Sequence, residues 1–90
     1  MFIFNEHQLN YLGNELRRAG KIKAAVKIYE LNVQEYPGST LVFESLGEMH
    51  RRNNNRKMAI RYFEKARELD PQNPRWNFIL EKIANDAGRK

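Results

Sequence analysis

Few side chains in this chain of 90 residues have the types and the spacing that catalysis or metal binding needs. The two histidines, His7 and His50, are far apart in the sequence, and neither has a second histidine or a carboxylate at ligand spacing. Glu44 and Glu48 lie four residues apart on one predicted helix, whereas paired catalytic carboxylates must flank a substrate. Cysteine is absent, which excludes thiolate catalysis and cysteine-ligated zinc. The sequence therefore predicts a protein without catalytic activity, metal or cofactor.

Two pairs of arginines, Arg17-Arg18 and Arg51-Arg52, could form a basic ridge for nucleic acid. The formal net charge of +5 is compatible with such a partner but does not require one. Cations are also common at helix C-termini, where the macrodipole stabilises each by about 0.3–1 kcal/mol. Moreover, aromatic residues do not alternate with these arginines on one face, as they do on a base-stacking platform. Nucleic-acid binding is therefore the least favoured of the functions considered.

The composition indicates a helix-rich domain outside the membrane. No apolar run approaches the roughly 20 residues of a membrane-spanning helix. The first residues lack the basic segment and the apolar stretch of a secretory signal. The chain has room for about four or five short helices and little room for a cleft between lobes. We therefore expect a cytoplasmic location and no contact with a membrane.

The strongest signal in the sequence is a repeat, because the chain shifted by 34 residues matches itself without an insertion. A fixed period with matching turn residues is the signature of a tandem repeat. Each unit has the apolar spacing of two helices separated by a short turn, which predicts a helical hairpin. The identical pairs include Leu12-Gly13 with Leu46-Gly47, Arg17-Arg18 with Arg51-Arg52, Ala25 with Ala59 and Pro37 with Pro71.

Turn and capping residues divide the chain into five predicted helices. Asn5 is the expected N-cap of the first helix, and Gln8 is placed to complete a capping box. Gly20 and Asn54 share one repeat position, and both residue types tolerate a left-handed backbone. Asn73 is expected to cap the last helix, with Pro74 at its first position. The first two predicted helices cover 6–18 and 22–36. The third runs from Thr40 to the turn at 52–55, the fourth runs from that turn to Asp70, and the fifth covers 74–87.

Both units follow one order of residue types: a bulky residue, Leu-Gly, a large residue, a small residue, an aromatic residue, a second small residue and a proline. The second unit supplies Phe43, Leu46-Gly47, His50, Ala59, Phe63, Ala66 and Pro71, and the first supplies Leu9, Leu12-Gly13, Leu16, Ala25, Tyr29, Asn32 and Pro37. This pattern resembles the tetratricopeptide repeat (TPR). Two positions depart from it, since Asn32 replaces a small apolar residue and His50 replaces the usual tyrosine.

The resemblance implies an all-α fold. Antiparallel helical hairpins would stack as a short right-handed TPR solenoid of five helices. Residues 1–90 would form a single TPR-like domain, with repeat 1 at 6–39, repeat 2 at 40–73 and a capping helix at 74–87.

The resemblance also implies a non-catalytic scaffold for protein–protein interaction. In the family, the first helices of successive hairpins line a concave groove that binds a peptide segment of a partner. The family's carboxylate clamp for C-terminal peptides does not fit, because only Asn14 and Arg75 match it. The groove positions implied here are His7, Asn10, Tyr11, Asn14, Arg17, Leu41, Glu44, Ser45, Glu48, Arg51, Arg75 and Phe78, with Ile79 and Lys82 beside them on the capping helix.

A second similarity, to short TPR modules appended to larger bacterial proteins, suggests a different role. The chain could then be an auxiliary or oligomerisation module of a larger bacterial enzyme. Phe78 and Ile79 lie off the apolar stripe of the last helix, and they are either the floor of the groove or a patch for self-association. We therefore expect a protein or peptide partner of unknown identity, and a monomer or weak homodimer.

Three further expectations concern single residues. Asn32 should hydrogen-bond to the next helix, because an unpaired buried amide costs about 1–3 kcal/mol. Trp76 should lie in the core and cover the second hairpin. Phe2, Ile3 and Phe4 should either pack under the first helix or mark a junction with an upstream domain.

Overall fold

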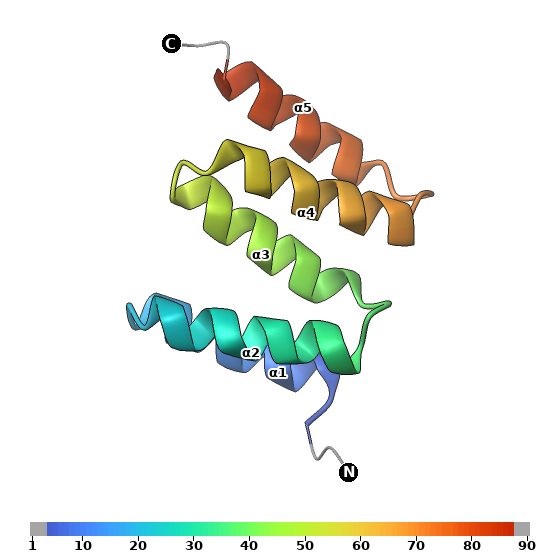
Figure 1. Ribbon diagram of the computed structural model, residues 1–90. Helices are drawn as coiled ribbons and strands as arrows, with labels where there is room; N and C mark the ends of the chain where they lie inside the picture. The colour runs from blue at the N-terminus through green and yellow to red at the C-terminus, as the bar shows by residue number, and fades with distance from the viewer. Residues whose placement is uncertain (1–3, 88–90) are drawn as a thin grey trace.

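The computed structural model describes residues 4–87, which form five helices and no strand (Figure 1). The all-α fold predicted from the repeat is confirmed. The predicted ends of the helices are nearly right, although α2 stops one residue early and α5 starts one residue late. The expectations for Phe2 and Ile3 lie outside the described residues. The helices are α1 (Glu6–Arg18), α2 (Ile22–Glu35), α3 (Thr40–Arg52), α4 (Arg56–Leu69) and α5 (Arg75–Ala87).

Local hydrogen bonds explain where the helices begin and turn. The side chain of Asn5 accepts a bond from the Gln8 amide at 2.8 Å, and the Gln8 side chain accepts one from the Asn5 amide at 2.9 Å. This is the predicted capping box. Gly20 and Asn54 have φ angles of 83° and 61°, so both hairpin turns use the left-handed conformation expected at this repeat position.

In each hairpin, a glycine of the first helix packs directly against an aromatic ring of the second helix. A Cβ atom placed on Gly47 of α3 would lie 2.7 Å from the Phe63 ring of α4. One repeat earlier, a Cβ atom on Gly13 of α1 would overlap the ring of Tyr29 on α2. Any larger residue would therefore push the two helices apart. The same contact occurs in both hairpins, so each pair of helices approaches closely at the same repeat position.

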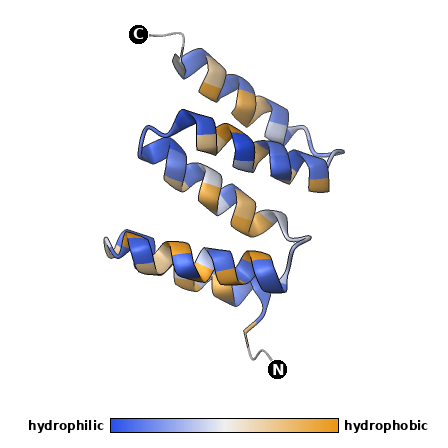
Figure 2. Cartoon of the chain, in the orientation of Figure 1, coloured by the Kyte–Doolittle hydropathy of each residue, from blue (hydrophilic) through white to orange (hydrophobic). Residues whose placement is uncertain are grey.

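The apolar core lies between the hairpins and under α5 (Figure 2). α3 packs on α4 and also touches α1 and α2, while α5 packs mainly on α4. Trp76 and Ile83 of α5 are buried against the side of α4 that carries Phe63 and Ala66. Trp76 is thus a core residue, as predicted, and its indole Nε1 donates a hydrogen bond to Asp70 at 3.2 Å.

Asn32 makes a hydrogen bond, but its partner is not on the predicted helix. Its Nδ2 donates to the backbone oxygen of Glu6 at 3.0 Å, so the partner is on the preceding helix, α1, and not on the next one. The reason is the antiparallel hairpin, in which the C-terminal half of α2 lies beside the first turn of α1. Oδ1 of Asn32 is buried without a hydrogen-bond partner.

His50 lies near the end of α3, and its ring stacks on the ring of Tyr62 in α4, with centroids 5.5 Å apart. Burial lowers the pKa of His50 below its ordinary value of 6.5, because desolvation disfavours the imidazolium form. The family's usual tyrosine position is therefore filled by another flat ring that packs against α4.

We predict that Gly47→Ala destabilises the protein by about 1–3 kcal/mol, because the added methyl group overpacks the contact with Phe63. The free energy of unfolding in urea measures this effect. Gly38→Ala is the matched control, since a Cβ atom there meets nothing within 4 Å, and it should change stability by less than about 1 kcal/mol. Equal stabilities of the two variants would show that the close contact does not set the helix spacing.

We also predict that stability falls as the pH drops below 6.5, the ordinary pKa of histidine. The folded-state pKa of His50 is lowered, so the unfolded chain takes up the proton first, and stability is lost as the pH falls toward the folded pKa. Urea unfolding from about pH 7.5 to about pH 5.5 measures this loss. His50→Gln should weaken the pH dependence, whereas His7→Gln, at an exposed position, should leave it unchanged. An identical pH profile for wild type and His50→Gln would refute the prediction.

Candidate functional site

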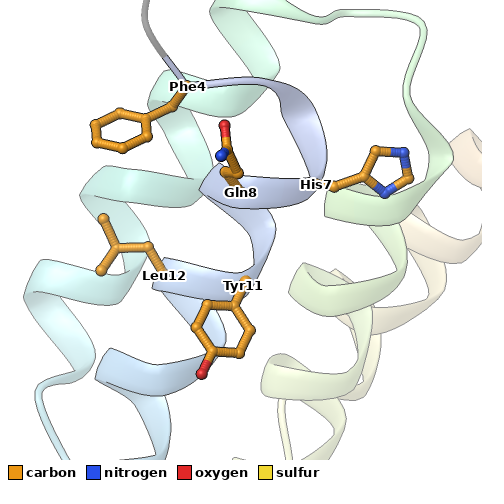
Figure 3. Close-up of a pocket in the computed structure, with 5 residues that line it drawn as sticks. All are labelled: Phe4, His7, Gln8, Tyr11 and Leu12. Atoms are coloured by element: carbon orange, nitrogen blue, oxygen red, sulfur yellow. The ribbon is translucent and has the colours of Figure 1, made fainter.

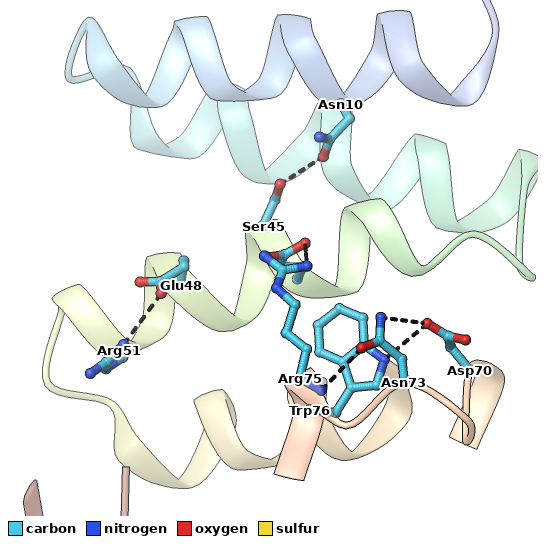
Figure 4. Close-up of polar contacts among 9 residues, drawn as sticks. Asn10, Ser45, Glu48, Arg51, Asp70, Asn73, Arg75 and Trp76 are labelled. Carbon is cyan, nitrogen blue, oxygen red and sulfur yellow. Dashed lines mark hydrogen bonds and ion pairs between the residues drawn. The ribbon is translucent and has the colours of Figure 1, made fainter. Parts of the chain in front are cut away.

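The first helices of the repeat units, α1 and α3, and the helix α5 lie side by side and form one surface, which we call the first-helix face. Within residues 4–87, three polar contacts connect these helices. Figure 4 shows the contact of Ser45 with Asn10 and the ion pair that Arg75 makes with α3. Ser45 of α3 donates to Oδ1 of Asn10 on α1 at 2.7 Å. Between α3 and α5, Arg75 forms a two-pronged ion pair with Glu44, and Arg51 lies 3.4 Å from Asp86.

None of the twelve residues predicted to line the groove is buried, and all of them are on α1, α3 or α5. Tyr11 and Phe78 are the most exposed large apolar residues among them, at 65% and 63%. The exposed members are His7, Tyr11, Arg75 and Phe78, and the half-buried members are Asn10, Asn14, Arg17, Leu41, Glu44, Ser45, Glu48 and Arg51.

Several of these polar residues are already engaged within the protein. Glu48 accepts from Arg51 at 3.3 Å and lies 3.9 Å from Arg52, the pairing expected for neighbours on one helix. Arg75 contacts Glu44 and also lies over the Trp76 ring, 5.1 Å from its centroid. The part of the face between α3 and α5 is therefore largely closed by ion pairs.

The α1 side of the face has more unused capacity. Asn14 accepts a hydrogen bond from the Tyr29 hydroxyl at 2.6 Å, and Asn10 accepts from Ser45. Both bonds use the Oδ1 oxygens, so within residues 4–87 they leave the N–H donors of the two amides available. The Tyr29 bond also ties the orientation of Asn14 to the aromatic ring that fills the first hairpin.

A hollow of about 430 Å³ adjoins this region on α1. It is lined by Phe4, His7, Gln8, Tyr11 and Leu12 (Figure 3). Phe4, Gln8 and Leu12 were not among the predicted site residues. Leu12 is 38% exposed, whereas Leu46, one repeat later, is 3% exposed. The repeat register contains one signal for this difference, because the polar residues Gln8 and Glu15 stand where the second repeat has Val42 and Met49.

A second hollow, of about 450 Å³, lies on the other side of the molecule, which the second helices α2 and α4 form. Its lining combines apolar side chains with two cations. The lining residues are Val33, Phe43, Met58, Arg61, Tyr62 and Lys65. This hollow is the alternative binding surface with which the first-helix face can be compared.

The described residues contain neither a cluster of metal-ligating side chains nor a helix that could span a membrane. Within 4–87, no group of three or more histidine, cysteine, aspartate or glutamate side chains is arranged to hold a metal ion. His7 is on α1, and His50 is stacked against Tyr62. In the same range, no helix has both the length and the apolar content that a membrane crossing requires.

Comparison with known protein families finds a tetratricopeptide repeat at residues 41–73. This segment covers nearly all of α3, the whole of α4 and the turn that follows. No curated protein matches the chain. Repeats of this kind act as protein–protein interaction modules, and the first hairpin has the same glycine–aromatic contact as the matched one. Residues 41–73 thus match the tetratricopeptide repeat, and the arrangement of five helices in residues 4–87 fits a TPR-like repeat domain.

Proposed function

We propose that the protein is a non-catalytic interaction module that binds a peptide segment of a partner protein on the first-helix face. The observation that carries this proposal is the combination, on α1, of an apolar hollow with polar side chains that still have free donors. An extended peptide needs both features, because its side chains require apolar contacts and its backbone requires hydrogen-bond partners. The face between α3 and α5, closed by ion pairs, would serve mainly to hold α5 in place.

Tyr11 is the residue on which this proposal places most of the binding energy. Its side chain is 65% exposed, and it lines the hollow together with Leu12. Exposed tyrosines are enriched among the residues that dominate binding energy at protein interfaces. Asn10 and Asn14 lie on either side of Tyr11 along α1 and supply amide donors for a peptide backbone.

Self-association through α5 is the second candidate function, and the exposed ring of Phe78 favours it. Lys82 lies 5.9 Å from the centroid of that ring, so the patch combines an apolar and a cationic group. This role would fit an oligomerisation module of a larger protein. It predicts a concentration-dependent dimer that Phe78→Ala abolishes.

We predict that Tyr11→Ala weakens peptide binding by at least about tenfold. The probe is a 12-residue peptide selected from a random display library on the full 90-residue chain, and its affinity is measured by fluorescence anisotropy. Amide NMR shifts should concentrate on Asn10, Tyr11, Asn14 and Ser45. Lys65→Ala, in the hollow between the second helices, is the control and should leave the affinity unchanged. A footprint on α2 and α4, or on Phe78 in a homodimer, would refute the proposal.

A further inference from the structure

The ion pair of Arg51 with Asp86, which joins α3 to α5, has no counterpart one repeat earlier, where both equivalent positions are arginines. At the step from α3 to α5, Arg51 pairs with Asp86 at 3.4 Å. A shift of 34 residues toward the N-terminus converts Arg51 into Arg17 and Asp86 into Arg52. The equivalent positions on α1 and α3 therefore hold two cations, where the next step holds a cation and an anion.

Within residues 4–87, Arg17 has no ion pair, and Arg52 shares its acidic partner, Glu48, with Arg51. Arg17 is half-buried, and its Nε atom is buried without a hydrogen-bond partner. The side chain of Arg52 is 70% exposed and lies 3.9 Å from Glu48, which is closer to Arg51 at 3.3 Å. In contrast, Arg18 has a short ion pair with Glu15 at 2.6 Å. Arg17 and Arg52 are thus the under-compensated cations of this end of the face.

The position of these arginines at helix ends explains only part of this arrangement. The negative ends of the α1 and α3 macrodipoles reduce the repulsion between cations placed there. A guanidinium nevertheless has five N–H donors in a planar fork, and it makes its strongest bonds with a carboxylate or a phosphate. The first repeat therefore has an arginine, Arg17, at the position of Arg51, but it has no acid at the position of Asp86.

We propose that an acidic side chain of the bound peptide takes the place between Arg17 and Arg52 that Asp86 takes beside Arg51. This inference rests on the proposed function, because it concerns a peptide on the same first-helix face. It adds the chemistry of the partner, namely an acidic segment. The partner's carboxylate completes a pair for which the next repeat uses a residue of this chain.

The distance to the apolar hollow gives the spacing within the peptide. Tyr11 and Arg17 are six residues apart on α1, which corresponds to about 9 Å along the helix axis. An extended chain advances about 3.3 Å per residue. A peptide that fills the hollow with an apolar side chain therefore presents its acidic residue about three positions away.

A peptide carboxylate fits this position better than a nucleic acid does. Glu15, Glu48 and Asp86 lie beside the arginines, and their charges oppose a continuous row of phosphates. Proteins that bind single-stranded nucleic acids also use aromatic rings next to the cations, on which the bases stack. Here, Tyr11 is more than one helical turn from Arg17. A single carboxylate meets less of this repulsion than a row of phosphates does, and it needs only the two guanidinium groups.

The test compares peptides selected from a random 12-residue display library on three forms of the full chain. These are the wild type, the double variant Arg17→Gln/Arg52→Gln, and the control Arg18→Gln/Arg61→Gln, which removes the same charge from other surfaces. Because Arg17 is half-buried, Arg52→Gln alone is also measured, since its side chain is exposed. Circular dichroism verifies that each variant is folded.

We expect wild-type peptides to be enriched in aspartate or glutamate about three positions from an apolar residue. Replacing that acid with its amide should weaken binding to wild type about tenfold, and binding to the Arg17→Gln/Arg52→Gln variant hardly at all. Arg52→Gln alone should show an intermediate loss, and the control should bind as wild type does.

Three other outcomes would overturn the inference. Peptides that bind the first-helix face without any acidic preference would refute the inference alone and leave the proposed function intact. The absence of any peptide footprint on that face would refute both. A 12-nucleotide single-stranded RNA that binds more tightly than the peptides, and loses this affinity in the Arg17→Gln/Arg52→Gln variant, would assign the arginines to nucleic acid instead.

Discussion

The close contact between a glycine and an aromatic ring determines the geometry on which everything else in this molecule depends. Gly13 faces Tyr29, and Gly47 faces Phe63, with no space for a Cβ atom in either case. Because both hairpins have the same contact, a shift of 34 residues in the sequence corresponds to nearly the same step in space. Residues at one repeat position therefore lie on one face, and for this reason the first helices present their polar positions together.

The same contact also connects the core to the candidate site. The ring of Tyr29 fills the space above Gly13, while its hydroxyl group reaches the side chain of Asn14 on the first-helix face. In the second hairpin the aromatic residue is Phe63, which has no hydroxyl, so the link exists only in the first one. The part of α1 that belongs to the first-helix face is therefore coupled to the packing of its hairpin more directly than the equivalent part of α3 is.

Local features and the burial of Trp76 could be predicted from the sequence, whereas the partners in polar contacts between helices could not. The capping box at Asn5 and the left-handed turns at Gly20 and Asn54 depend on residues within a few positions of each other, so the residue types suffice. The partner of Asn32 depends on how far α2 extends along α1, and a sequence pattern does not contain that register. The pairing of Arg51 with Asp86 is a similar case.

The hollow on α1 was missed because it lies at the edge of the repeat array. At the positions where α3 buries Val42, Leu46 and Met49 in the core, α1 has Gln8, Leu12 and Glu15. Two of the three apolar positions have become polar, so α1 has no stacking surface of full strength, yet Leu12 is retained. Phe4 closes the hollow from a segment before the helix, where the Tyr36 hydroxyl donates a hydrogen bond to its backbone oxygen. A repeat position that serves packing inside the array thus becomes, at its edge, an exposed apolar surface beside the polar groups of the first-helix face.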